Sequence, residues 1–166
     1  MSFLRFVMLL SLAVWIGALI FFPVVAQTSF SVLPSTHLAG LVVRDSLVKL
    51  HWMVFVCGFL FLASSLVYNR MLIGRAHVFG LGHMGLNHVL IISMLALTAF
   101  SQFRIIPRMD TLPTSAMEIA TRASDDPIRQ QFDSLHAWST RIEETVLVLG
   151  LIVLYSTSRR ICSSHA

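Results

Sequence analysis

Charged residues are scarce in this chain. Only 12% of its 166 residues are charged and 56% are hydrophobic, whereas about a quarter of a typical soluble domain is charged. The mean hydropathy is correspondingly high, at +0.79. This balance excludes a disordered chain, a coiled coil and an ordinary soluble enzyme, and it predicts helices embedded in a membrane.

Cysteine and the common catalytic motifs are scarce as well. The two cysteines are Cys57, inside an apolar run, and Cys162, near the C-terminus. They form no Cys-x-x-Cys pair, so neither a zinc site nor a thioredoxin-like site is expected. The sequence also contains no nucleophile elbow and no phosphate-binding loop, and Gly80, Gly82 and Gly85 are interpreted as a turn and a helix start instead of a dinucleotide fingerprint. These absences predict a protein without catalytic activity.

Basic residues outnumber acidic ones, at 12 against 8, which gives a formal net charge of +4. They flank the apolar runs, and no basic patch is interleaved with aromatic residues. Such cations orient a membrane protein, so the sequence does not predict binding of nucleic acid.

Four apolar segments have the length that a membrane crossing requires. They cover about residues 6–26, 51–68, 86–103 and 139–158. The first is too long for the apolar region of a typical signal peptide, so we expect it to be retained. Residues 35–50 form an amphipathic lead-in to the second segment, and about 104–126 form a long polar loop. The pattern predicts an all-α membrane four-helix bundle, built as a single domain over residues 1–166.

Several residues mark where the last two helices end and begin. Arg104 and Pro107 follow the third segment, and proline disfavours helix at the residue before it. Asp126 is suited to cap a helix, and Pro127 to occupy its first position. We therefore expect the fourth helix to run from Pro127 to about Ser158. It would be longer than the bilayer core, so its first turns would project from the membrane.

The distribution of cations predicts the orientation. Four crossings place both termini on one side, together with five arginines in short segments: Arg5, Arg70, Arg75, Arg159 and Arg160. The cations of the other side are spread over longer loops. Because Lys and Arg in short loops stay in the cytoplasm, we expect both termini on the cytoplasmic side of a bacterial inner membrane.

Seven histidines are many for so apolar a chain. A haem held by two histidines inside a bundle needs one from each of two helices at similar depth. His51, at the start of the second span, and His136, on the fourth helix, form the best pair. The alternative is that the histidines lie at headgroup level and bond only to backbone or water. The cofactor therefore stays open: haem or a metal ion is conceivable, and none is favoured.

The fourth helix carries a polar stripe. Arg129, His136 and Glu143 are seven residues apart and fall on one helix face, while Glu143 and Glu144 immediately precede an apolar run. Ionisable groups at membrane depth usually face the bundle and pair. We therefore expect His136 and Glu143 to point toward the other helices.

Two arginines are the expected partners of these carboxylates. Arg104 and Arg108 lie at the outer end of the third span, near Glu143 and Glu144 in the predicted topology. One interpretation is a structural ion pair that fixes the bundle. The other is a metal-ion or proton site formed by His51, His136, Glu143 and Glu144.

Three ordered motifs suggest a family. Trp15-Ile16-Gly17 lies in the first span, Pro107-Arg108-Met109 follows the third, and Leu135-His136-Ala137-Trp138-Ser139 lies on the fourth helix. Their order and spacing, over nearly the whole chain, resemble the bacterial domain of unknown function related to transmembrane protein 205. The resemblance implies four spans and a long third loop, without an established reaction.

The functional expectation follows from the missing catalytic groups. We expect a non-catalytic protein that works by association, as an accessory or structural subunit of a larger membrane complex. Its partners would be the lipid bilayer and other membrane subunits. Two alternatives remain, namely metal-ion or proton handling through the outer histidines and glutamates, and a haem-binding redox protein using His51 and His136.

Overall fold

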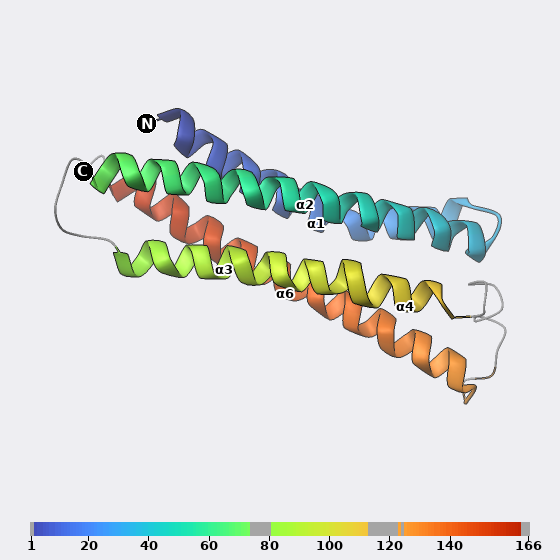
Figure 1. The fold of residues 1–166 in the computed structure, drawn as a ribbon. Coiled ribbons are helices and arrows are strands. Elements are labelled where there is room, and N and C mark those ends of the chain that lie inside the picture. The colour runs from blue at the N-terminus through green and yellow to red at the C-terminus, as the bar shows by residue number, and fades with distance from the viewer. Residues whose placement is uncertain (1, 74–80, 113–122, 124, 164–166) are drawn as a thin grey trace.

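The computed structural model describes residues 2–73, 81–112, 123 and 125–163, and their regular structure is entirely helical (Figure 1). The elements are α1 (Ser2–Val32), α2 (Thr36–Ile73), α3 (Leu81–Phe100), the π-helical turn η1 (Ser101–Ile105), α4 (Ile106–Asp110) and α6 (Pro127–Ser163). The predicted all-α class is confirmed for the described residues.

The long helices run alternately up and down (Figure 1). The neighbouring pairs are α1 with α2, α2 with α3, α3 with α6, and α6 with α1, so that each long helix packs against two others. As a result, α1 begins and α6 ends at the same end of the bundle. We call this the terminal end, and the end where α4 lies the loop end.

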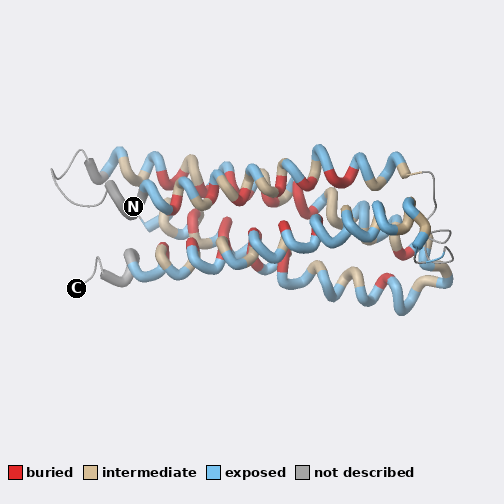
Figure 2. Tube along the Cα trace, turned by 90° about the horizontal axis from the view of Figure 1, so that it is seen from below, coloured by how far each residue is buried: buried red, intermediate tan, exposed pale blue. Residues whose placement is uncertain are grey.

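Apolar side chains line both the inside and the outside of the bundle. In α1 the buried residues Met8, Leu12, Trp15 and Leu19 recur at helical spacing and pack against the other helices. Figure 2 shows buried positions along the inner faces and exposed positions along the outer ones. Large apolar residues are also common outside, for example Phe59, which is 70% exposed. Lipid is the solvent that suits such a surface.

Within the described residues, three helical stretches are long and apolar enough to cross a membrane: Ser2–Val32, Thr36–Met71 and Gly85–Asp110. The second includes both the predicted amphipathic lead-in and the predicted span, which form one continuous helix. Helix α6 begins at Pro127, as the sequence predicts, and continues to Ser163. The carboxylate Oδ1 of Asp126 accepts a hydrogen bond of 2.8 Å from the Ile128 amide, which caps the helix start.

The sequence predicts that the third helix ends near Phe103, but the structure shows that it does not end there. It continues through η1 and α4 to Asp110, so the helix replaces the first part of the expected loop. Pro107 lies in the first turn of α4. Proline has no backbone N–H, but the bond that closes the π turn is donated by the Ile106 amide, so Pro107 does not interrupt the helix here. Residues 113–122 and 124 of the expected loop lie outside the described residues.

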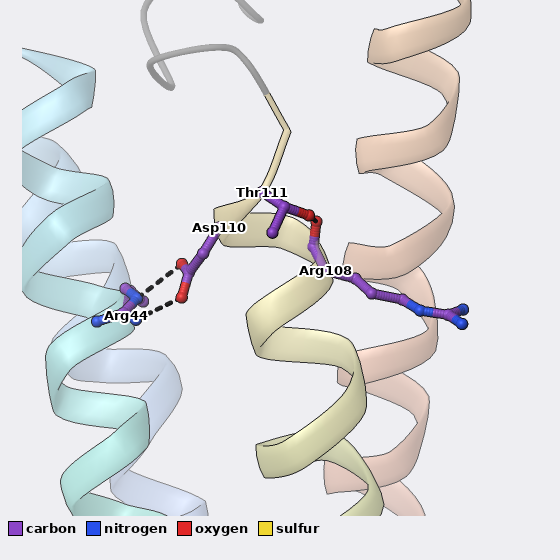
Figure 3. A network of polar contacts seen from close by, with 4 residues as sticks. All are labelled: Arg44, Arg108, Asp110 and Thr111. Atoms are coloured by element: carbon purple, nitrogen blue, oxygen red, sulfur yellow. Dashed lines mark hydrogen bonds and ion pairs between the residues drawn. The ribbon is translucent and has the colours of Figure 1, made fainter.

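Polar pairs join helices at both ends of the bundle. At the terminal end, Arg5 donates to the Tyr68 hydroxyl from Nε at 3.0 Å and from a terminal nitrogen at 2.6 Å. At the loop end, Arg44 of α2 forms a two-pronged ion pair with Asp110 of α4 (Figure 3). These contacts set the relative heights of α1, α2 and α4.

A substitution at Gly58 tests the close contact between α2 and α3. A Cβ atom on Gly58 would lie 2.6 Å from Leu95 Cδ2, whereas one on Gly17 would meet nothing within 4 Å. We expect Gly58→Leu to cost about 1–3 kcal/mol of stability, the usual penalty for overpacking. Gly17→Leu should have little effect. The melting temperature in mild detergent measures both, and equal values would show that α2 and α3 are not in close contact here.

Candidate functional site

A histidine without solvent exposure lies where three helical elements meet. The His51 side chain of α2 is 0% exposed. Its Nδ1 atom lies 2.7 Å from Oε1 of Gln102 in η1, and its Nε2 atom lies 2.7 Å from Oε1 of Glu143 in α6. Both ring nitrogens therefore have a hydrogen-bond partner, each on a different element.

Local structure explains how these side chains meet. His51 lies on the buried face of α2, beside Leu50 and one turn from Val54. Glu143 follows the buried Ile142 on α6, and its side chain is 16% exposed. A π turn holds one residue more than an α-helical turn and is frequent at functional sites. Here it contains Gln102, and the helix presents that side chain to His51.

The hydrogen bonds restrict where protons lie. Because the Gln102 carbonyl oxygen can only accept, Nδ1 of His51 carries a proton. One further proton lies between Nε2 and the Glu143 carboxyl group. The pair is either imidazolium with carboxylate or neutral imidazole with carboxylic acid. Both forms have zero net charge, which a site of low polarity favours, since an unpaired buried charge is costly.

Two serines extend this polar layer. Ser101 precedes Gln102, and Ser139 lies one helical turn before Glu143. Both are buried, and their Oγ atoms lie 3.5 Å apart. This contact joins η1 directly to α6, whereas the other link between these two elements runs through His51 of α2.

His136 and Glu144 are not part of this site. His136 is exposed, and its ring stacks on Phe132 of its own helix at a centroid distance of 6.2 Å. Glu144 is exposed as well. The structure thus brings His51 and Glu143 together, but it does not bring His136 to His51 as a haem pair. Nowhere in the described part of the chain do three or more His, Cys, Asp or Glu gather as metal ligands.

Arg104 and Arg108 do not pair with the glutamates in the described structure, where Glu143 bonds to His51 instead. The physical reason is the π turn. It directs Gln102 toward His51, and a residue two positions further along a helix lies on the opposite side. Arg104 and Arg108 are exposed.

Sequence reasoning missed Gln102. The residue type signals no chemistry by itself, but an amide at the end of an apolar segment needs a partner when it is buried. Sequence spacing could not identify that partner, because the π turn η1 contains one residue more than an α-helical turn and so changes which side chains face inward.

A second polar cluster lies toward the terminal end. The buried Asn87 of α3 donates to the Thr157 hydroxyl at 3.3 Å and accepts from the Ser156 hydroxyl at 2.6 Å. The three groups satisfy one another and contain no ionisable member. We therefore interpret this cluster as a contact that fixes α3 against α6.

Two alanine substitutions separate the buried glutamate from its exposed neighbour. Glu143→Ala leaves a ring nitrogen of His51 without a partner, which should cost about 1–3 kcal/mol of stability. Glu144→Ala should change the stability by less than about 0.5 kcal/mol. Thermal unfolding in detergent measures the difference. Matching losses would mean that Glu143 is solvated and not bonded to His51.

Comparison with known proteins gives the family without a reaction. A family model described as Domain of unknown function (DUF4149) matches residues 10–118, a region that includes His51 and Gln102. Glu143 lies beyond the matched residues. No curated protein and no solved structure matches the chain. Since the match spans more than half of its length, the chain belongs to the family of the Domain of unknown function (DUF4149).

Proposed function

We propose that this protein crosses the bacterial inner membrane four times, with both termini in the cytoplasm. Three helical stretches suited to a membrane support this topology, as does the packing of α6 between α1 and α3. The apolar second half of α6 would form the fourth crossing. The arginines in the short segments at the terminal end support a cytoplasmic location.

The depth of the histidine site follows from this topology. Ile16 lies at the middle of the first predicted span, and a Cβ atom on Gly150 would lie 3.2 Å from both Ile16 and Met94. These three residues therefore mark the bilayer centre. Gln102 is eight residues from Met94, and Glu143 is seven from Gly150, which corresponds to about 10–12 Å. The site would thus lie inside the hydrocarbon region, whose half-thickness is about 15 Å.

We infer that the function is proton handling at the pair of His51 and Glu143. The observation that carries this proposal is the 2.7 Å contact between a fully buried imidazole nitrogen and a carboxylate. The pair holds one proton between an imidazole and a carboxylate, both of which can accept a proton. Ionisable residues at this depth in a membrane usually have a functional role. A metal ion or haem iron would need a free ring nitrogen of His51, and both are engaged.

Other expectations from the sequence stay predictions. They include the role of accessory subunit in a larger membrane complex and the relation to transmembrane protein 205. Neither depends on the histidine site, so both are compatible with proton handling.

Nitrogen NMR of histidine-labelled protein in lipid bilayers tests the proposal. In the natural protein we expect an Nε2 signal of His51 that differs from that of an unprotonated imidazole nitrogen, because a proton lies between Nε2 and the Glu143 carboxyl group. In Glu143→Gln the amide donates to Nε2, so the ring should remain neutral with its proton on Nδ1. His51→Gln assigns the signals.

Glu144→Gln is the matched control, since it removes a neighbouring carboxylate that does not contact His51. Its His51 spectra should follow those of the natural protein. If Glu143→Gln also left the His51 protonation unchanged, the two groups would not share a proton, and the proposal would be wrong.

A further inference from the structure

A cleft of about 590 Å³ opens between α6 and the segment formed by the end of α3, η1 and α4. It combines cationic, hydroxyl and apolar groups. The residues that matter here are Phe100, Arg104, Arg108, Ser134, Leu135 and Trp138. It lies at the loop end of the bundle and does not include His51 or Glu143.

The two arginines of the cleft are available for a ligand. Both are exposed and lie four residues apart. Within the residues that the structure describes, neither forms an ion pair, and the nearby carboxylate of Asp110 is engaged by Arg44. Figure 3 shows the Arg108 side chain extending toward α6, away from Asp110. The cleft therefore holds two guanidinium groups that have no carboxylate partner among the described residues.

Apart from Ser134, the rest of the lining is apolar or aromatic. Phe100 is 53% exposed and Trp138 is 56% exposed, and Leu135 packs at the edge of the core. The Ser134 hydroxyl is the uncharged polar group available beside the arginines. A ligand that fits must carry negative charge on one part and hydrocarbon on another.

The depth of the cleft in the membrane indicates which kind of ligand it can bind. Arg104 is ten residues from Met94, and Trp138 is twelve from Gly150, which places both about 15–18 Å from the bilayer centre. That is the boundary between hydrocarbon and headgroups, where tryptophan concentrates and lipid phosphates lie. Arg108 is a further turn outward, within the headgroup region.

We propose that this cleft binds an anionic phospholipid. Guanidinium groups match the geometry of a phosphate with paired hydrogen bonds, and this cleft presents two of them beside an apolar wall. Arg104, Arg108 and the Ser134 hydroxyl hold the phosphate, while an acyl chain lies along Phe100 and Leu135. A free phosphate ion would gain nothing from this apolar wall. The inference depends on the membrane topology but not on proton transfer at His51.

Native mass spectrometry of the full chain, purified in neutral detergent, tests the site. We titrate it with phosphatidylglycerol, with phosphatidylcholine of the same acyl chains, and with inorganic phosphate. The expected result is one retained phosphatidylglycerol and much weaker retention of phosphatidylcholine. The double variant Arg104→Gln/Arg108→Gln should bind phosphatidylglycerol about tenfold more weakly, since two charge-assisted contacts are lost.

The control variant Arg70→Gln/Arg159→Gln removes the same charge at the terminal end and should retain the lipid. Arg104→Lys/Arg108→Lys should bind between the natural protein and the glutamine variant, because lysine keeps charge but loses paired bonding. Unchanged melting temperatures establish that all variants fold.

Several results would overturn the proposal. They are an equal loss of lipid in the control variant, equal retention of both lipids, and displacement of phosphatidylglycerol by millimolar inorganic phosphate. The first would assign the effect to net charge, the second to apolar contact alone, and the third to a site for free phosphate.

Discussion

A polar side chain inside an apolar bundle has no water to bond with, and this constraint organises the middle of the molecule. The two nitrogens of His51 find their partners on two other elements, Gln102 on η1 and Glu143 on α6. Sliding any of the three elements by one residue would separate the partners and leave a buried group unsatisfied. The relative heights of α2, η1 and α6 therefore depend on one imidazole ring.

The other polar contacts apply the same constraint elsewhere. Arg5 with Tyr68 aligns α1 with α2, and Arg44 with Asp110 aligns α2 with α4. Asn87 aligns α3 with α6. Apolar packing between these contacts is not directional, so it stabilises the bundle without choosing one register. The polar contacts make that choice, and they are spaced along the full length of the helices.

Local signals in the sequence predicted much of this architecture. Long apolar runs predicted helices, and Asp126 with Pro127 predicted the start of α6, because capping depends on neighbouring residues alone. The entry of Glu143 into an apolar run predicted a carboxylate that faces the bundle. Its partner could not be predicted, since that depends on how α3 is wound near Gln102. His136 shares the stripe of Glu143 but stands further out, where the bundle no longer covers it.

The π turn also has a consequence for the phase of the helix to which it belongs. One additional residue rotates everything that follows by about 100° relative to an uninterrupted α-helix. A helical wheel drawn across residues 86–110 as one α-helix therefore assigns the wrong face to the residues that follow the π turn. Met94 and Arg108, fourteen residues apart, would share a face on such a wheel, yet Met94 is buried and Arg108 is exposed. Deleting a single residue from Ser101–Ile105 would close the π turn into an α turn and leave Met94 and Arg108 on opposite faces, because thirteen residues of uninterrupted α-helix span the same rotation as fourteen residues that include the π turn. The additional residue is therefore absorbed within one turn, and the arginines keep their place outside the bundle.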